Sequence, residues 1–246
     1  MTETKTKGLS ADVLKMIAII AMTLDHAAPV LASAESPLGI AIHFFGRFTA
    51  PIMCYFIAEG YHYTHDVKKY ALRLFIFAAI SQVPYQLLFG LGNLLAFPPQ
   101  ISMIFTLFCG LIALIAWDRI ENTALRLLAV IALCAVTWWS DWQIFGVLFI
   151  LAFGVFYGDK KKQMTAFALF AAAKIIYNVS SDLITGHNPI VELSKLGLFC
   201  VIPLLLLYNG TRKKSAWRKW FFYIYYPAHL LLFAVINLLV IGYKGQ

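Results

Sequence analysis

The sequence predicts an all-α protein, a polytopic bundle of about nine transmembrane helices that forms a single domain over residues 1–246. Apolar residues make up 61% of the chain and charged residues only 13%, whereas soluble domains average about 45–50% and about 25%. Mean hydropathy is +0.76. The apolar runs approach the roughly 20 residues that cross a bilayer, and they are too continuous for the alternation of strands.

Nine apolar runs give the candidate spans. They cover residues 12–31, 39–61, 68–90, 101–117, 124–139, 144–157, 163–183, 195–208 and 218–241. The sixth and eighth are shorter than a comfortable span, so seven or eight crossings remain open. Several boundaries coincide with turn-forming residues, at Ser36-Pro37, Gly90 through Pro99, Gly158-Asp159 and Gly186 to Pro189.

Loop charges predict the orientation of the chain. Lys and Arg are retained on the cytoplasmic side of a membrane. With nine alternating spans, one side collects Lys5, Lys7, Lys68, Lys69, Arg119, Arg126, Lys160, Lys161, Lys162, Arg212, Lys213, Lys214, Arg218 and Lys219, and the other only Lys195 and Lys244. We therefore expect a multi-pass protein of the bacterial cytoplasmic membrane, with a polar N-terminus (residues 1–11) inside and the C-terminus outside.

Composition argues against several classes of partner. The four cysteines lie within apolar runs without the spacing of a metal site or a disulfide framework, so we expect no bound metal. The net charge of +8 comes largely from short loops between spans and is read as topological, not as a nucleic-acid surface. The first run lacks a convincing cleavage site, so we expect it to remain as a span.

Ionisable side chains inside the spans are the candidate functional residues, because a charge in the bilayer core is costly unless it is paired or functional. Asp25 and His26 lie in the outer half of the first span, while His43 and Arg47 share one face of the second. Neighbours on a helix point about 100° apart, so Asp25 and His26 face different partners. We expect Asp25 to pair with Arg47, as an active-site group or as a structural salt bridge, and His26 to face a cavity.

Two further groups stand out. Near the cytoplasmic face, Glu59 and Arg73 are positioned to pair beside Lys68, Lys69 and Tyr70, either as an interfacial ion pair or as the basic mouth of a site for an anionic donor. In the last span, Tyr225, Tyr226 and Pro227 precede His229 near mid-depth. A lone membrane histidine is more often a packing residue, but histidines on two spans together with an arginine favour a site.

No motif for serine, metal or nucleotide-triphosphate chemistry occurs in a usable context. Histidines and carboxylates therefore favour acid–base group transfer. Two other classes remain open: a secondary transporter or channel, since buried charges and a proline-broken helix also mark permeation routes, and a non-catalytic membrane assembly factor. Transporters usually show repeated halves, which this sequence lacks.

A set of short segments resembles the TraX family, named after the acetylase that modifies the amino terminus of F-type conjugative pilin. They are Leu24-Asp25-His26, Phe45-Gly46-Arg47, Ala58-Glu59-Gly60-Tyr61, Val67-Lys68-Lys69-Tyr70, Leu72-Arg73-Leu74, Ser81-Gln82-Val83-Pro84, Phe222-Tyr223 and Tyr226-Pro227-Ala228-His229-Leu230. The similarity is strongest over residues 12–90 and 215–235, and over about 120–200 only hydropathy matches.

The resemblance implies an acetyltransferase that moves an acetyl group from acetyl-CoA to an amine, such as the N-terminus of a small membrane peptide resembling pilin. As hypotheses, Glu59, Lys69, Tyr70 and Arg73 would bind acetyl-CoA. His26 would act as the base, Asp25 and Arg47 would fix the local geometry, and His229 or Tyr226 would supply a second proton relay or oxyanion contact.

Overall fold

The structure is a computed structural model that describes residues 7–90, 100–212 and 216–244. Two compact units are present. The first unit combines Met1–Met53 with Ala173–Ala216, and the second combines Cys54–Ala172 with Trp217–Gln246. Each unit is described by itself below. The sequence prediction of one domain over 1–246 stays a prediction.

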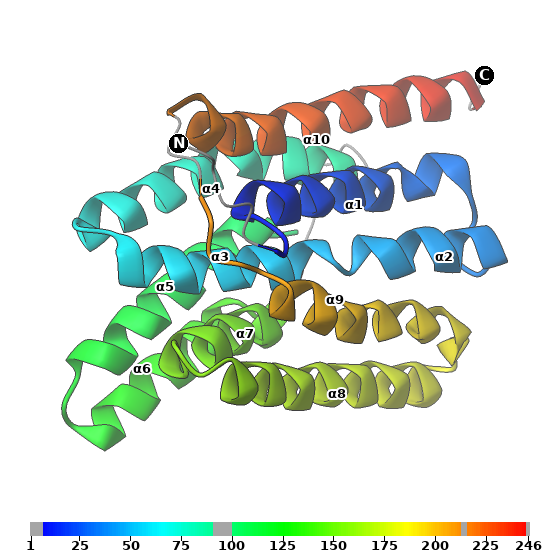
Figure 1. The fold of residues 1–246 in the computed structure, drawn as a ribbon. Helices are drawn as coiled ribbons and strands as arrows, with labels where there is room; N and C mark the ends of the chain where they lie inside the picture. The colour runs from blue at the N-terminus through cyan, green and yellow to red at the C-terminus, as the bar shows by residue number, and fades with distance from the viewer. Residues whose placement is uncertain (1–6, 91–99, 213–215, 245–246) are drawn as a thin grey trace. The chain divides into compact units, whose positions relative to one another are not determined.

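The described residues are organised as helices, which confirms the all-α prediction (Figure 1). In chain order these are α1 (Ala11–Leu31), α2 (Pro37–Gly46), α3 (Thr49–Tyr63), α4 (Val67–Phe89), α5 (Met103–Arg119), α6 (Thr123–Val136), α7 (Gln143–Val155), α8 (Lys160–Thr185), the 3₁₀ helix η1 (Pro189–Leu196), α9 (Gly197–Leu206) and α10 (Ala216–Lys244). Each of the nine predicted runs corresponds to one helix or to a pair of consecutive helices.

Two runs differ from the prediction in detail. The second run is interrupted at Arg47, so that it forms α2 and α3 in succession. The eighth run begins earlier than predicted, because Asn188 caps η1 through its side chain and Pro189 occupies the first turn, where its missing N–H costs nothing. The added 3₁₀ turns lengthen this short run to Pro189–Leu206.

Among the described residues, five helical segments are long and apolar enough to cross a membrane: Pro37–Tyr63, Val67–Phe89, Lys160–Thr185, Pro189–Leu206 and Trp220–Leu239. Several apolar helices of this kind in one chain indicate a membrane protein. The number of crossings and their orientation stay predictions.

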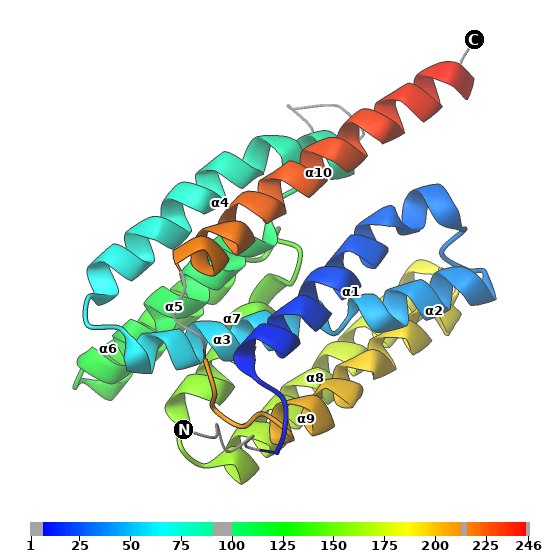
Figure 2. The same cartoon turned by 45° about the horizontal axis from the view of Figure 1, so that its top comes forward.

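In the first unit, α1 lies beside α2, and α2 also contacts η1 and α9 (Figure 1, Figure 2). Both α1 and α2 begin with a serine cap: Ser10 accepts from the Val13 amide and Ser36 from the Gly39 amide. Such caps satisfy amides that have no partner within the helix. The caps therefore fix the residues at which α1 and α2 begin. They thereby fix how far along each helix its polar side chains lie.

In the second unit, α5 packs against α4, α6 and α7. The α5–α7 contact is built on glycines: Gly146 faces Thr106, Gly110 faces Ile150 and Gly154 faces Leu114. The constant offset between partners means that α5 and α7 run parallel. Small residues let helix backbones approach closely in a membrane, where no hydrophobic driving force joins helices.

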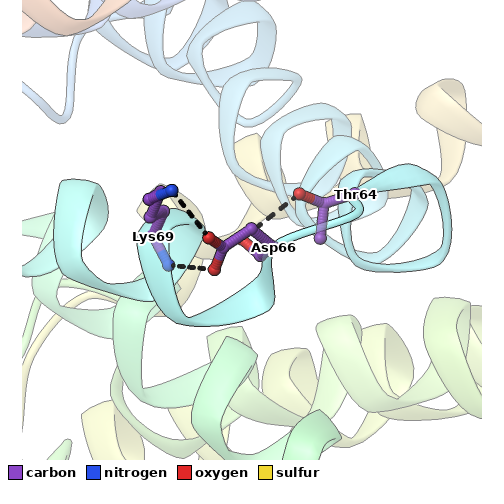
Figure 3. A network of polar contacts seen from close by, with 3 residues as sticks. All are labelled: Thr64, Asp66 and Lys69. Carbon is purple, nitrogen blue, oxygen red and sulfur yellow. Dashed lines mark hydrogen bonds and ion pairs between the residues drawn. The ribbon is translucent and has the colours of Figure 1, made fainter.

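The helices α4 and α10 lie side by side in the second unit, as both views show (Figure 2). Phe77 of α4 stacks on Tyr223 of α10 with 4.7 Å between ring centroids. The start of α4 is fixed by a side-chain cap, in which Asp66 Oδ1 accepts from the Lys69 amide at 2.9 Å (Figure 3). The cap and the stack together fix the position of the first turns of α4, and with it the position of their polar residues along the helix axis.

Candidate functional site

A carboxylate and an imidazole meet between α1 and α2 in the first unit. Asp25 Oδ1 lies 2.7 Å from His43 Nδ1. A carboxylate only accepts hydrogen bonds, so Nδ1 is the donor and carries the hydrogen. The two side chains are 21% and 19% exposed. The sequence had placed His43 on the same helix face as Arg47 but had not assigned it a partner.

Gly46 makes this approach possible. It is buried at the end of α2, and a Cβ built on it would lie 2.5 Å from Asp25 Cγ, closer than real contacts allow. Gly197 at the start of α9 likewise lies against the Phe44 carbonyl and 3.4 Å, measured from a built Cβ, from Arg47 Cβ. Gly46 therefore lets α2 approach Asp25 of α1, and Gly197 lets the start of α9 approach Phe44 and Arg47.

Arg47 and His26 both interact electrostatically with the Asp25 carboxylate. The sequence predicts a pair of Asp25 with Arg47. In the structure, Arg47 interacts with the Asp25 carboxylate electrostatically, and the hydrogen bond of that carboxylate is to His43. His26 is buried, with 8% of its surface exposed. The cluster formed by Asp25, His26, His43 and Arg47 is called the outer cluster below.

A second charged pair borders the outer cluster. Lys195 Nζ contacts both carboxylate oxygens of Glu192 on η1, and both side chains are largely buried. Lys195 also interacts electrostatically with Arg47 and with Asp182 of α8. The first unit therefore concentrates opposite charges in a segment that composition assigns to the membrane, and paired charges of this kind are the form in which ions are tolerated there.

A proline inside α1 affects the backbone beside Asp25. A proline has no N–H, so it cannot donate to the carbonyl of the residue four positions earlier. Pro29 stands four residues after Asp25, so the Asp25 carbonyl does not receive the helical hydrogen bond from that position.

In the second unit, three of the four residues predicted to bind the donor lie together. The Arg73 guanidinium lies 5.8 Å from the centre of the Tyr70 ring and interacts electrostatically with the Tyr223 side chain, and Glu59 interacts with Tyr70 electrostatically. Glu59 is 4% exposed and Tyr70 9%. The set Glu59, Tyr70, Arg73 and Tyr223 is called the arginine cluster.

The arginine cluster has spare hydrogen-bonding capacity. Within the described part of the chain, the Nε of Arg73 is buried and has no hydrogen-bond partner. Such an orphaned donor is costly in a folded protein unless a ligand or water satisfies it. Tyr223, which the sequence interpretation did not include, was detectable only through its motif beside Phe222.

Lys69 does not belong to the arginine cluster. Its side chain is 77% exposed, and its Nζ lies 3.2 Å from Asp66 Oδ2 (Figure 3). The Asp66 carboxylate thus accepts a hydrogen bond from the backbone amide of Lys69 and forms an ion pair with its ammonium group. The hydrogen bond from the amide is the main reason why the pKa of Asp66 is lowered. Lys69 helps to begin α4 and lies in the loop that precedes the cluster.

His229 belongs to the second unit. Its Nδ1 lies 2.8 Å from the Tyr225 carbonyl, and its ring stacks on Tyr225 with 5.0 Å between centroids. Tyr226 presents its edge to the same ring and accepts from the Met103 amide at 3.3 Å. His229 and Tyr226 are therefore neighbours. His26 lies in the other unit.

Among the described side chains, no group of three metal-ligating residues gathers at one place. The polar groups that do gather are an imidazole–carboxylate pair flanked by an arginine, and an arginine flanked by tyrosines. The first set can exchange protons with a bound nucleophile. The second can hold an anion through charge-assisted hydrogen bonds.

Comparison with known proteins agrees with the motifs. A family model described as TraX protein matches residues 10–237. A curated relative, the probable fimbrial assembly protein FimC, serogroup H1, of Dichelobacter nodosus, is 30% identical over 230 residues that cover 91% of this chain and 93% of the relative. No solved structure matches. Because the family model matches nearly the whole chain, the protein is a member of the TraX family.

Proposed function

We propose that this membrane protein is an acetyltransferase that moves the acetyl group of acetyl-CoA onto an amine. The observation that carries the proposal is the outer cluster, in which a carboxylate has one histidine in hydrogen bond and a second histidine and an arginine in electrostatic contact. An ammonium must lose a proton before its nitrogen can attack, and a histidine titrates in the range where it can take that proton.

The arginine cluster supports the donor side of the reaction. Acetyl-CoA carries phosphate groups, and a guanidinium with an unsatisfied N–H is a suitable partner for a phosphate oxygen. Lys68 and Lys69 are exposed at the beginning of the same helix. In the predicted orientation these residues face the cytosol, where the donor is available.

The acceptor follows from the family and from the position of the outer cluster. In the predicted topology, Asp25 and His43 lie in the outer half of their helices, where a membrane peptide can present its amino group. The curated relative is named as a fimbrial assembly protein. We therefore propose the N-terminus of a small pilin-like membrane peptide as the acceptor.

The experiment uses the full chain in lipid nanodiscs with acetyl-CoA labelled in the acetyl group and a detergent extract of membranes from cells that lack the protein. We expect label in one small membrane polypeptide, with an added acetyl mass at its N-terminus. Absence of any labelled product, with the protein folded and the extract enriched in small membrane peptides, contradicts the proposal.

The name of the relative favours a second candidate, a non-catalytic assembly factor for a fimbrial subunit. Such a factor would bind the peptide without changing its mass, so mass spectrometry of the captured peptide separates the two functions. A transporter, the remaining alternative, would move a labelled solute into proteoliposomes in the absence of acetyl-CoA.

A further inference from the structure

We infer that His43, held in position by Asp25, is the base that takes the proton from the attacking amine. The inference rests on the proposed acetyl transfer and assigns its proton-accepting step to one nitrogen atom, Nε2 of His43. The interpretation of the sequence had assigned this role to His26. The geometry of the outer cluster favours His43 for three reasons.

The first reason is the hydrogen bond itself. Asp25 accepts from Nδ1 of His43 at 2.7 Å, so a neutral His43 has its lone pair on Nε2. In the described part of the chain, Nε2 of His43 makes no hydrogen bond. A carboxylate that holds one ring nitrogen fixes the tautomer and direction of the other and stabilises the imidazolium once a proton arrives.

The second reason is access. The side chain of His43 is partly exposed, whereas His26 is buried. His43 stands six residues after Pro37, which begins α2, so it lies about 9 Å along the helix from that end. A base this close to the helix end can meet an amino group carried at the tip of a membrane peptide.

The third reason is the charge around the ring. Charged and titratable groups around Asp25 include His26 from α1 and Arg47 from the end of α2. Lys195 of η1 interacts with Arg47, with Glu192 and with Asp182 of α8. Asp25 is the group in direct contact with His43 Nδ1, so it stabilises the imidazolium that forms when Nε2 takes the proton.

Acetyl transfer forms one C–N bond and breaks one C–S bond. The acceptor amine attacks the thioester carbonyl carbon, and a C–N bond forms. Nε2 of His43 takes one proton from that nitrogen. The C–S bond then breaks, the electron pair leaves with the CoA sulfur, and the thiolate takes up a proton, which the imidazolium can supply directly or through water. The products are the N-acetyl peptide and CoA thiol.

The decisive variant is His43→Asn in nanodiscs. The asparagine amide can replace Nδ1–H as a donor to Asp25, but it cannot accept a proton. General acid–base catalysis contributes about 10²–10⁴, so we expect acetyl transfer to fall by about 100-fold or more and the dependence of the rate on pH to change. His187→Asn is the matched control, because His187 is exposed in a loop and bonded to Thr185.

Two outcomes overturn the inference while leaving the proposed function intact. One is wild-type turnover by His43→Asn. The other is reduced turnover with the same pH profile as the wild type, because the base would then be another group and His43 only structural. A wild-type chain without acetyl transfer is a different result, because it contradicts the proposed function itself.

A measurement on the wild-type protein covers the case in which the variant does not fold. Diethylpyrocarbonate adds to neutral imidazole nitrogens, and peptide mass spectrometry locates the added group. We expect loss of acetyl transfer to follow modification of His43 at the same rate. Inactivation that follows His26 or His229 while His43 stays unmodified overturns the assignment.

Discussion

Gly46 of α2 touches the Asp25 side chain of α1 so closely that a Cβ at position 46 would lie 2.5 Å from Asp25 Cγ. The glycine is thus part of the mechanism that brings Asp25 to His43, because any side chain at this position pushes the carboxylate away. Overpacking of this kind costs about 1–3 kcal/mol in a well-packed protein. The Phe45-Gly46-Arg47 motif therefore has a steric explanation.

The change Gly46→Ala tests this explanation. We expect a lower melting temperature in detergent and a loss of acetyl transfer larger than the loss of folded protein, because the Asp25–His43 hydrogen bond is displaced. Ala41→Leu is the control, since it adds more volume at an exposed position of the same helix. Unchanged activity of Gly46→Ala would show that the position tolerates a methyl group.

The parallel contact of α5 with α7 gives a second prediction. A Cβ at Gly110 would overlap Cδ1 of Ile150 and lie 3.2 Å from its Cβ. Alanine is favoured over glycine within a helix by about 1 kcal/mol, whereas overpacking costs about 1–3 kcal/mol. We therefore expect Gly110→Ala to lower the unfolding free energy.

The double-mutant cycle is the sharper measurement. Ile150→Val deletes Cδ1 and alone costs about 0.5–1.5 kcal/mol. Because the deleted atom is the one that the new methyl group meets, the double variant should be more stable than the sum of the two single changes predicts. Additive losses would show that the two positions do not contact one another.

The helical runs could be predicted from the sequence because hydropathy measures directly which segments the bilayer accepts. The break at Arg47 and the 3₁₀ start of η1 could not, since both depend on local backbone geometry near Gly46 and Pro189. The pattern of apolar residues does not indicate where one helix ends and the next begins within an apolar run.

The polar pairs were predictable only in part. The loop between α3 and α4 is short, so the end of α3 lies near the start of α4. This explains why Glu59, Tyr70 and Arg73 lie together. The Asp25–His43 hydrogen bond was missed, because His43 and Arg47 share one helix face and the sequence cannot say which of them reaches the carboxylate. Tyr223 was missed as a partner because it is distant from Arg73 in sequence.

The cap of α4 predicts a pH dependence. The pKa of Asp66 is lowered, mainly by the hydrogen bond from the Lys69 amide. A carboxyl group whose pKa is lower in the folded state stabilises that state at neutral pH, and this stabilisation disappears as pH falls from about 3.9 through the folded-state value. We expect Asp66→Ala to melt earlier at pH 7, with the difference from wild type shrinking in acid. Glu121→Ala, in another exposed loop, is the control, and a constant difference at all pH values would contradict the linkage.

The orientation inferred from loop charges is tested by labelling. In a background without Cys54, Cys109, Cys134 and Cys200, single cysteines are placed in exposed loops as His65→Cys or His187→Cys. We expect a membrane-impermeant maleimide to label position 187 in intact cells and position 65 only after the cells are opened. The reverse pattern would place the basic loops outside.

The arginine cluster gives the last prediction. If Arg73 holds a phosphate of acetyl-CoA, Arg73→Lys keeps the charge but loses the planar set of donors, so the KM for acetyl-CoA should rise about 10-fold while the KM for the acceptor changes little. Tyr223→Phe, which removes the hydroxyl group that interacts with Arg73 and keeps the stack on Phe77, should raise the same KM by a smaller factor. Arg126→Lys is the control, because the Arg126 guanidinium lies over Trp117, away from the cluster. Equal changes in the KM of donor and acceptor would mean that Arg73 supports the fold of the second unit and does not bind the donor.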